Sequence, residues 1–239
     1  MFIWRLINSG MSPQETLLVV LVYILVISLA FSFHEFMHAT VAYKLGDDTP
    51  YNMGRVTLNP MAHIDFMGLI MLILMGFGWG RPVVWNINRI TKCKPRTAII
   101  LVSLAGVTGN FILALIAEVL GVVVLHFVSP AVIWYYLIQY FFYFLIEVNL
   151  GLLAFNLLPI PPLDGFKLID ELLPVKARYS NFYKKFVMYG PTILFVVIII
   201  GSFANIPVFE WLLTIIEMPF RFLLGLAGSG LEMLMSKIG

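Results

Sequence analysis

The chain has 239 residues, of which 61% are hydrophobic and only 12% are charged, and its mean hydropathy is +0.95. Soluble domains are about half apolar and a quarter charged, so this composition excludes an ordinary soluble fold and indicates a polytopic membrane protein. The net charge of +2 is too small to predict a nucleic-acid partner. Because Cys93 is the only cysteine, a disulfide framework and a cysteine-based metal cluster are also excluded.

The first predicted element is one long helix from about 15 to 45, which ends at the Gly46-Asp47-Asp48 sequence. At 1.5 Å per residue this helix is about 45 Å long, longer than the roughly 30 Å hydrocarbon core of a bilayer. Its apolar run exceeds the core of a signal peptide and lacks a small-residue cleavage site. We therefore expect a membrane span that is retained in the protein.

Near the end of this helix, residues 34–38 form an H-E-x-x-H motif. Residues four apart share a helix face, so His34 and His38 are placed to bind one metal ion. Glu35 lies beside them, where a carboxylate can deprotonate a metal-bound water. The alternative is a chance match in an apolar helix. It would leave two histidines and a carboxylate idle at membrane depth, where polar groups are costly.

Residues 47–65 are polar and rich in turn-forming residues, and the apolar stretch 66–79 that follows is too short for a full span. We predict that 66–79 is a re-entrant segment. Non-helical backbone at membrane depth is tolerated only where it is buried in protein or lines water, so such a segment would mark a cavity. A basic loop follows at 81–96, in which 82–85 has the pattern of a short extended strand.

The later membrane segments are predicted at 97–127, at 131–158, at 187–203, and at about 208–226, where the stretch either spans or lies at the interface. Lys and Arg collect in 81–96 and 164–185, and two spans separate these loops. Both loops are therefore expected to face the cytoplasm. With 66–79 re-entrant, the H-E-x-x-H end of the first helix lies on the same side.

The expected fold class is thus an all-α polytopic membrane protein with about five to six transmembrane helices. We expect a single membrane-embedded domain over 1–239, with a core at 15–165 and additional C-terminal membrane segments at 186–227. Its expected location is the cell membrane, with the site toward the cytoplasm.

A catalytic zinc site has three protein ligands and a water, so a third ligand must come from another part of the chain. The candidates are His63, Asp65, Glu118, His126, Glu147 and Asp164. Glu118 and His126 have no companion motif, and a lining or interfacial role explains them better than ligation. The role of Glu147 is left open.

Asp164 has a more specific setting, because three prolines occupy four positions at 159–162. Such a run cannot continue a helix, so we expect the chain to unwind and present Asp164 from an extended segment before a flexible Gly165. An ordinary proline-rich turn explains these residues about equally well, since Pro and Asp-Gly are common in turns.

Together with H-E-x-x-H in a membrane helix, the sequence of 156–165, Asn-Leu-Leu-Pro-Ile-Pro-Pro-Leu-Asp-Gly, resembles the site-2 protease family of intramembrane metalloproteases. Residues 54–65 look like the segment that follows the first motif in compact bacterial members. Residues 105–110 resemble the A-G-P-x-x-N motif, although Val107 replaces its proline, and Phe66 stands where many relatives have proline. Because no PDZ or CBS module is recognised, the chain resembles a minimal member.

The resemblance implies that His34, His38 and Asp164 bind one zinc ion per chain and that Glu35 is the catalytic base. It implies hydrolysis of peptide bonds within or near transmembrane segments of other proteins, as in regulated intramembrane proteolysis. Asn156 matches the family position of an oxyanion donor. An asparagine that hydrogen-bonds the end of a span explains it equally well.

The implied partners are a transmembrane protein substrate, the lipid bilayer and an accessory or regulatory membrane protein that supplies selectivity, with no nucleic acid. The 82–85 segment is a candidate edge for pairing with an unwound substrate. His63 and Asp65 either gate or support the site or, as we favour, are ordinary polar residues at the interface.

Two other function classes fit parts of this pattern. An ion-binding transporter would use polar residues at membrane depth such as Glu118, Glu147 and Asn149. Transporters usually show paired internal repeats, however, and this sequence has none that we can find. A non-catalytic homologue that only binds membrane segments would have no need of Glu35, which this chain retains.

Overall fold

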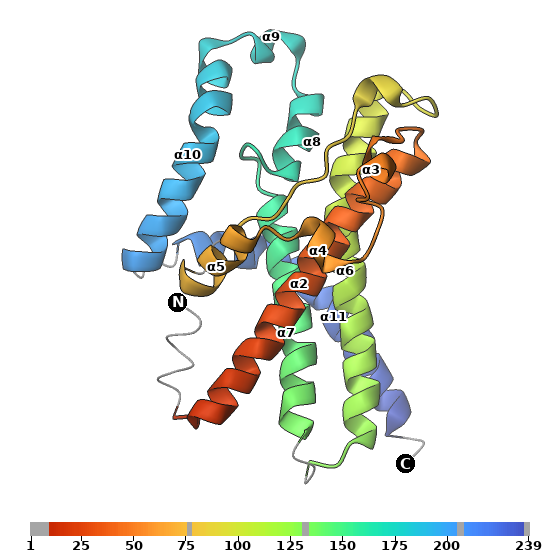
Figure 1. The fold of residues 1–239 in the computed structure, drawn as a ribbon, viewed down its shortest axis with the longest axis vertical. Helices are drawn as coiled ribbons and strands as arrows, with labels where there is room; N and C mark the ends of the chain where they lie inside the picture. The colour runs from red at the N-terminus through yellow and green to blue at the C-terminus, as the bar shows by residue number, and fades with distance from the viewer. Residues whose placement is uncertain (1–9, 76–77, 131–133, 205–207, 237–239) are drawn as a thin grey trace.

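The computed structural model describes residues 10–75, 78–130, 134–204 and 208–236. Within these ranges the chain is helical, with no strand and one isolated antiparallel bridge. Five of the described helices are long and apolar enough to cross a membrane (Figure 1). The expectation of an all-α polytopic membrane protein is confirmed, whereas the assignment of one domain to 1–239 stays a prediction.

The first described helix, α2 (Pro13–Lys44), is the long span expected at the start of the chain. Ser12 and Glu15 form a capping box: the Ser12 hydroxyl accepts from the Glu15 N–H, and the Glu15 carboxylate accepts from the Ser12 N–H at 2.8 Å. The helix ends before Gly46, whose φ of +111° suits glycine. Both ends are therefore set by local sequence.

Helices α6 (Pro95–Phe127) and α7 (Tyr135–Asn156) pack against α2 and against each other to form the centre of the bundle (Figure 1). Small side chains let helix backbones approach closely, as in other membrane bundles. The buried small residues of α6 are Ala98, Ala105, Gly106, Gly109, Ala114, Ala117 and Gly121.

Between α2 and α6 the chain dips into the bundle and returns to the end from which it came (Figure 1). This segment carries the short helices α3 (Thr49–Asn52), α4 (Pro60–His63) and α5 (Phe66–Met75). With 10 residues, α5 is about 15 Å long and cannot cross a bilayer. The arrangement agrees with the re-entrant prediction, of which residues 76–77 lie outside the described ranges.

The return path differs from the predicted strand at 82–85. The isolated bridge joins Ile64 to Gly80, and the Arg81 N–H donates to the His63 carbonyl at 2.7 Å. Residues 82–85 have no regular secondary structure, and the described chain offers them no partner strand. The 3-10 turn η1 (Ile87–Arg89) follows.

The C-terminal part consists of α8 (Asp164–Leu172), α9 (Val175–Arg178), α10 (Asn181–Ala204) and α11 (Val208–Met235). Two predicted boundaries need correction: α10 begins at 181 rather than 187, and α11 continues to 235 rather than 226. Helix α11 packs against α6 and α7, and it is long and apolar enough to span. Its polar interruptions do not end it, because Arg221 is paired with neighbouring carboxylates.

Candidate metal centre

Three predicted ligands meet inside the protein. His34 and His38 come from adjacent turns of α2, and Asp164 comes from the first turn of α8. The Nε2 atoms of the two histidines lie 2.9 Å apart, and they lie 3.4 Å (His34) and 3.0 Å (His38) from Oδ2 of Asp164. All three side chains are buried. The fold therefore brings three potential metal-ligand atoms close together.

The donor set fits a zinc ion. Two imidazole nitrogens and one carboxylate oxygen are the protein ligands of many catalytic zinc sites, which keep a fourth position for water. Oδ2 of Asp164 is buried and accepts no hydrogen bond from the residues that the structure describes. A buried carboxylate oxygen without a partner is costly, and a metal ion between the three atoms would remove that cost.

The outer nitrogens of both imidazoles contact helix α6. Nδ1 of His38 lies 2.6 Å from the Val102 carbonyl, so it carries the proton and Nε2 keeps its lone pair for a metal. Nδ1 of His34 lies 3.3 Å from the Asn110 side-chain amide, whose Oδ1 has no partner among the described residues. Turning that amide by 180° lets Oδ1 accept the Nδ1 proton and frees Nε2 of His34 as well.

Helix α6 approaches the site closely because it carries Gly106 at the point of contact. A Cβ atom there would lie 2.4 Å from Nε2 of His38 and 2.5 and 2.7 Å from ring atoms of His34. No side chain larger than hydrogen fits without moving the imidazoles. Gly106 is thus part of the wall that holds both rings.

Asp164 stands at the start of α8, following a non-helical connection over 157–163, and this corrects the expected extended presentation. Gly165 serves a different purpose from the predicted flexibility: a Cβ atom there would lie 2.2 Å from the Leu157 carbonyl oxygen. The glycine lets the first turn of α8 pack directly on the end of α7. This contact fixes where Asp164 points.

The second oxygen of Asp164 is also engaged. Nζ of Lys167, one turn later in α8, donates to Oδ1 at 2.9 Å. Burial by itself would raise the pKa of the Asp164 carboxyl, but hydrogen bonds from His34 and His38 when protonated at Nε2, together with the charge of Lys167, outweigh burial and lower this pKa below its ordinary value; a bound metal ion would take the place of those protons. Asp164 is therefore held as a carboxylate, with Oδ1 on Lys167 and Oδ2 facing the histidines.

Glu35 is buried beside the cluster, as the motif predicts. Its Oε2 accepts a hydrogen bond from the Val83 N–H at 2.8 Å, so the extended segment after the re-entrant loop contacts the predicted base. Asn156 lies at the end of α7, where its amide donates to the Leu152 carbonyl at 2.9 Å. That bond is what the alternative reading of Asn156 expects, and its predicted oxyanion role stays a prediction.

The other candidate ligands lie in different settings. His63 is fully buried with Nε2 2.9 Å from the Thr57 carbonyl, and Asp65 accepts from the Gly68 N–H at the start of α5. Neither belongs to the three-residue cluster. Both tie the re-entrant segment together, which agrees with a structural rather than a ligating role.

The polar residues that a transporter would use lie away from the three-residue cluster. Glu147 pairs with Arg221 at 2.7 Å, and the Asn149 amide donates to the Leu145 carbonyl. Glu118 and His126 line a separate cavity of about 490 Å³ between α6, α7 and α11.

Three contributors to the site were not predicted as such: Gly106, Asn110 and Lys167. A signal existed for each. Gly106 and Asn110 lie in the segment that resembles A-G-P-x-x-N, and Lys167 lies three residues after Asp164, where a helix brings two side chains together. The sequence did not indicate that Gly106 and Asn110 would contact the imidazoles.

Comparison with known proteins gives related chains. The family model described as Peptidase family M50 matches residues 118–199, a region that contains Asp164. The Bacillus subtilis protein named "Putative zinc metalloprotease YwhC" is 43% identical over 157 residues, which are 65% of this chain and 70% of that protein. No solved structure gives a significant match.

Two further relatives carry the same description in their names. Rip2 of Mycolicibacterium smegmatis is 33% identical over 162 residues, 64% of this chain and 58% of that protein. The Methanocaldococcus jannaschii protein MJ0611 is 28% identical over 157 residues, 66% of this chain and 73% of that protein. This chain therefore spans a little over half of Rip2 and about seven tenths of the other two relatives.

Five apolar helices around a buried two-histidine, one-carboxylate cluster with an adjacent glutamate define a membrane metallopeptidase of the zinc-dependent class. The relatives agree with that class. The chain belongs to peptidase family M50, the site-2 protease family.

Proposed function

We propose that this protein hydrolyses peptide bonds within or near transmembrane segments of other membrane proteins, with His34, His38 and Asp164 as zinc ligands and Glu35 as general base. One observation carries the proposal. The three donor atoms and Glu35 are buried together inside a helix bundle that is long and apolar enough to span a membrane. A peptide bond reaching this site would have to come from a segment that is itself in or near the bilayer.

Zinc, when bound, supplies a Lewis acid that makes a water nucleophilic near neutral pH. Glu35 accepts the proton of the attacking water and returns it to the amine nitrogen of the leaving peptide. The Val83 N–H holds Oε2 of Glu35, which fixes the carboxylate and leaves Oε1 for the proton. The charged intermediate needs a hydrogen-bond donor, and the Asn156 amide is the proposed one, released from its bond to Leu152.

A helical segment hides its carbonyl groups, so the substrate must unwind before it can react. Residues 82–85 lie beside Glu35 and are not paired in a strand or coiled in a helix, and we propose that unwound substrate pairs with their backbone. The gain in main-chain hydrogen bonds would offset part of the cost of unwinding. An accessory membrane protein is the proposed source of further selectivity.

The proposed orientation places the site toward the cytoplasm. The end of α2 with the motif, the basic loop 81–96 and the connection from α8 to α10 lie toward one end of the bundle (Figure 1). Lys and Arg in short loops favour the cytoplasmic side. A protease-accessibility or cysteine-labelling measurement on loop 81–96, using the native Cys93, would test this orientation.

The experiment that tests the activity compares the wild type with Glu35→Gln in detergent. We expect both proteins to bind about one zinc per chain, because Glu35 is not among the ligands, and only the wild type to cleave a model transmembrane peptide. Glu118→Gln, which changes a carboxylate away from the metal cluster, should behave as the wild type. Absence of zinc from the repleted wild type, or cleavage by Glu35→Gln at the wild-type rate, would contradict the proposal.

A further inference from the structure

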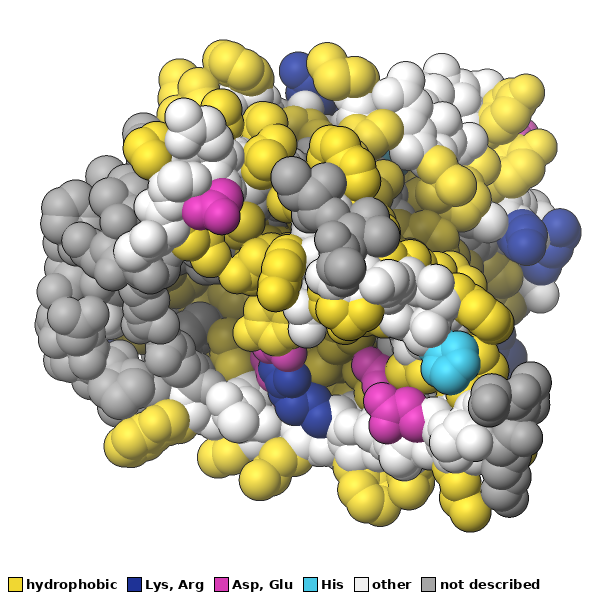
Figure 2. Space-filling view, turned by 90° about the horizontal axis from the view of Figure 1, so that it is seen from below, with side chains coloured by type: hydrophobic (Ala, Val, Ile, Leu, Met, Phe, Trp, Pro, Cys, Tyr) yellow, Lys and Arg dark blue, Asp and Glu magenta, His cyan; other side chains and the backbone are white. Residues whose placement is uncertain are grey.

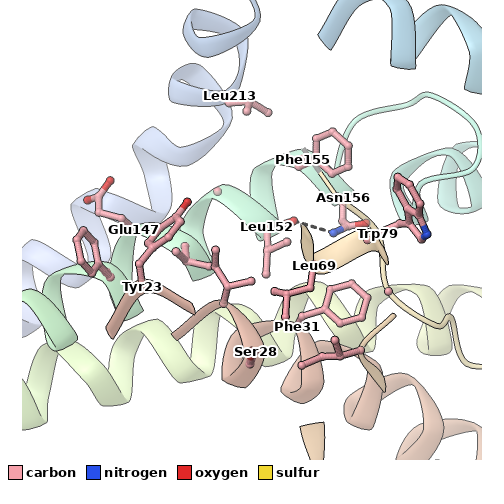
Figure 3. Close-up of a pocket in the computed structure, with 18 of the residues that line it drawn as sticks. Tyr23, Ser28, Phe31, Leu69, Trp79, Glu147, Leu152, Phe155, Asn156 and Leu213 are labelled. Carbon is pink, nitrogen blue, oxygen red and sulfur yellow. Dashed lines mark hydrogen bonds between the residues drawn. The ribbon is translucent and has the colours of Figure 1, made fainter. Parts of the chain in front are cut away.

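A cavity of about 530 Å³ opens between α2, α5 and α7, with single residues from α10 and α11 closing its far side. Figure 3 shows Tyr23 and Glu147 at one end of this cavity and Asn156 and Trp79 at the other. Its lining is mostly apolar. The cavity is therefore long enough and apolar enough to take part of a membrane segment.

The part of α2 that borders the cavity lies just before the proposed base. Tyr23, Ile27 and Phe31 line the cavity. Glu35 is not among the lining residues, but it follows Phe31 by about one helical turn. A segment bound at the Phe31 end of the cavity would therefore lie about one turn from the proposed base.

The opposite wall comes from α7 and contains an open position. Glu147, Gly151 and Phe155 line the cavity at the same four-residue spacing. A Cβ atom built on Gly151 would meet nothing within 4 Å, so the space beside it is vacant. This glycine keeps the groove wide without being required by the packing of the bundle.

The end of the cavity far from Asn156 carries charge. Arg221 of α11 makes two bonds of 2.7 Å to the Glu147 carboxylate, and its Nε and Nη2 lie 2.9 and 2.7 Å from Oε2 of Glu217. Two carboxylates share one guanidinium, so the group keeps one negative charge when all three are ionised. Figure 2 shows Lys/Arg and Asp/Glu side chains together in a hollow between apolar surfaces.

That remaining charge has capacity for another donor. An ionised carboxylate has about four acceptor positions, of which Arg221 occupies two on Glu147. The Glu147 side chain is 34% exposed toward the cavity side, whereas that of Glu217 is 9% exposed. An unbalanced negative charge is costly at membrane depth, and a positively charged side chain would neutralise it.

We propose that this cavity binds the membrane segment of the substrate and that Glu147 selects a segment with a Lys or Arg at its depth. This inference rests on the proposed protease function and names its substrate class. Glu147 and Asn156 are nine residues apart on α7, or about 14 Å at 1.5 Å per residue. Asn156, the proposed oxyanion donor, would lie at the cleaved bond. A basic residue paired with Glu147 would therefore be about four residues from that bond in an extended substrate and about nine in a helical one.

Binding tests this inference separately from catalysis. The Glu35→Gln protein is mixed in detergent with a series of fluorescent transmembrane peptides in which a single Lys is moved along the segment. Each peptide is matched by one with Met at that position, because Met is similar in length and uncharged. We expect Lys to bind at least about tenfold more tightly than Met at one depth, since each tenfold corresponds to only about 1.4 kcal/mol.

Two substitutions assign the preference to Glu147. Adding Glu147→Gln leaves Arg221 balanced by Glu217 and should bring the Lys-to-Met ratio close to one. Adding Glu118→Gln removes a carboxylate from the other cavity and should leave the ratio unchanged. Equal binding of Lys and Met peptides at every position, or a Lys preference that survives Glu147→Gln, would overturn the inference.

A third substitution tests whether the peptide occupies the cavity beside Gly151. Gly151→Leu fills the vacant space and should weaken binding of all peptides at least about tenfold while zinc content is unchanged. Gly225→Leu, at a position in α11 that also has open space and does not line the cavity, is the control. If Gly151→Leu binds peptide normally, the cavity is occupied by something else, such as lipid, and the inference is wrong.

The proposed proteolysis and the proposed role of Glu147 would be contradicted by different results. Lys-dependent binding without cleavage by the wild type supports the cavity assignment and contradicts the proposed proteolysis. Cleavage by the wild type without any Lys preference supports proteolysis and overturns the role of Glu147.

Discussion

Two polar clusters in the described part of the bundle differ in how far their members satisfy one another. Glu147, Glu217 and Arg221 form close ion pairs between α7 and α11, so each of these side chains already has a partner of opposite charge. In the cluster of His34, His38 and Asp164, three lone-pair donors face one point. Hydrogen bonds around the outside hold them there.

The difference indicates what each cluster is for. Paired charges of opposite sign join α7 and α11 without a metal ion, and the one negative charge left over is the one assigned above to a basic residue of the substrate. Three donors that face one another need a cation between them, because lone pairs repel and a buried oxygen without a partner is costly. The first cluster therefore supports the position of α11, and the second is incomplete without a metal ion.

The contrast between the two clusters is tested most strongly by changing Asp164, which should cause the largest loss of zinc affinity. In Asp164→Asn a neutral amide replaces the anionic ligand, and we expect zinc affinity to fall by more than about a hundredfold, beyond the range for residues that only contact a ligand. Metal content and chelator competition measure this. Zinc binding that equals the wild type would remove Asp164 from the ligand set.

A comparable loss is expected when the wall of the site is moved. In Gly106→Ala the added methyl group overlaps both imidazoles, so the rings must turn away from Asp164. Zinc content should fall strongly and cleavage with it, although alanine favours the helix. Gly225→Ala, at an uncrowded helix position, is the matched control. Normal zinc content in Gly106→Ala would contradict the close packing of α6 on the site.

A smaller effect should come from the residue that orients His34. Asn110→Leu keeps about the same volume and removes the acceptor for the Nδ1 proton, so His34 loses its preferred tautomer. We expect zinc affinity to fall about 10–100-fold with little change in the fold. Isothermal titration against Asn110→Asp, which restores an oxygen acceptor, distinguishes orientation from packing, and equal affinities in all three proteins would exclude the contact.

The smallest effect should come from the paired cluster, and it should appear in stability rather than in zinc binding. Arg221→Met leaves two carboxylates without their cation, and we expect the free energy of unfolding to fall by about 2 kcal/mol, less than for a fully buried pair because the Arg221 side chain is 39% exposed. Adding Glu147→Gln should recover part of the loss. Thermal unfolding in detergent measures both, and a loss of zinc from Arg221→Met would contradict the separation of the two clusters.

The sequence predicted the parts of the site whose geometry is local. His34 and His38 share a helix face by spacing alone, and the capping box at Ser12 and Glu15 gives α2 its start. Asp164 emerged from the proline run together with the family resemblance. Its placement on the first turn of α8 was not foreseen, because it depends on Gly165 packing against the end of α7.

The contacts that were missed are tertiary. Nothing in one sequence says that Asn110 meets His34 or that Gly106 faces both imidazoles, since these contacts depend on the angle at which α6 crosses α2. The extension of α11 past 226 has the same origin. A proline and several charges within an apolar stretch suggest an end, and only the pairing of Arg221 with Glu147 on another helix explains why the helix continues.

The hydrogen bond from Val83 to Glu35 joins a loop to a helix that is packed in the bundle. Glu35 is on α2, which packs against α6 and α7, whereas Val83 is in the basic loop 81–96, at a point without regular secondary structure. The proposed general base is therefore supported by the bundle on one side and by this loop on the other. If Glu35 acts as proposed, a partner that binds the loop and shifts Val83 would move the Glu35 carboxylate, and the cleavage rate would change without any change in the three proposed zinc ligands.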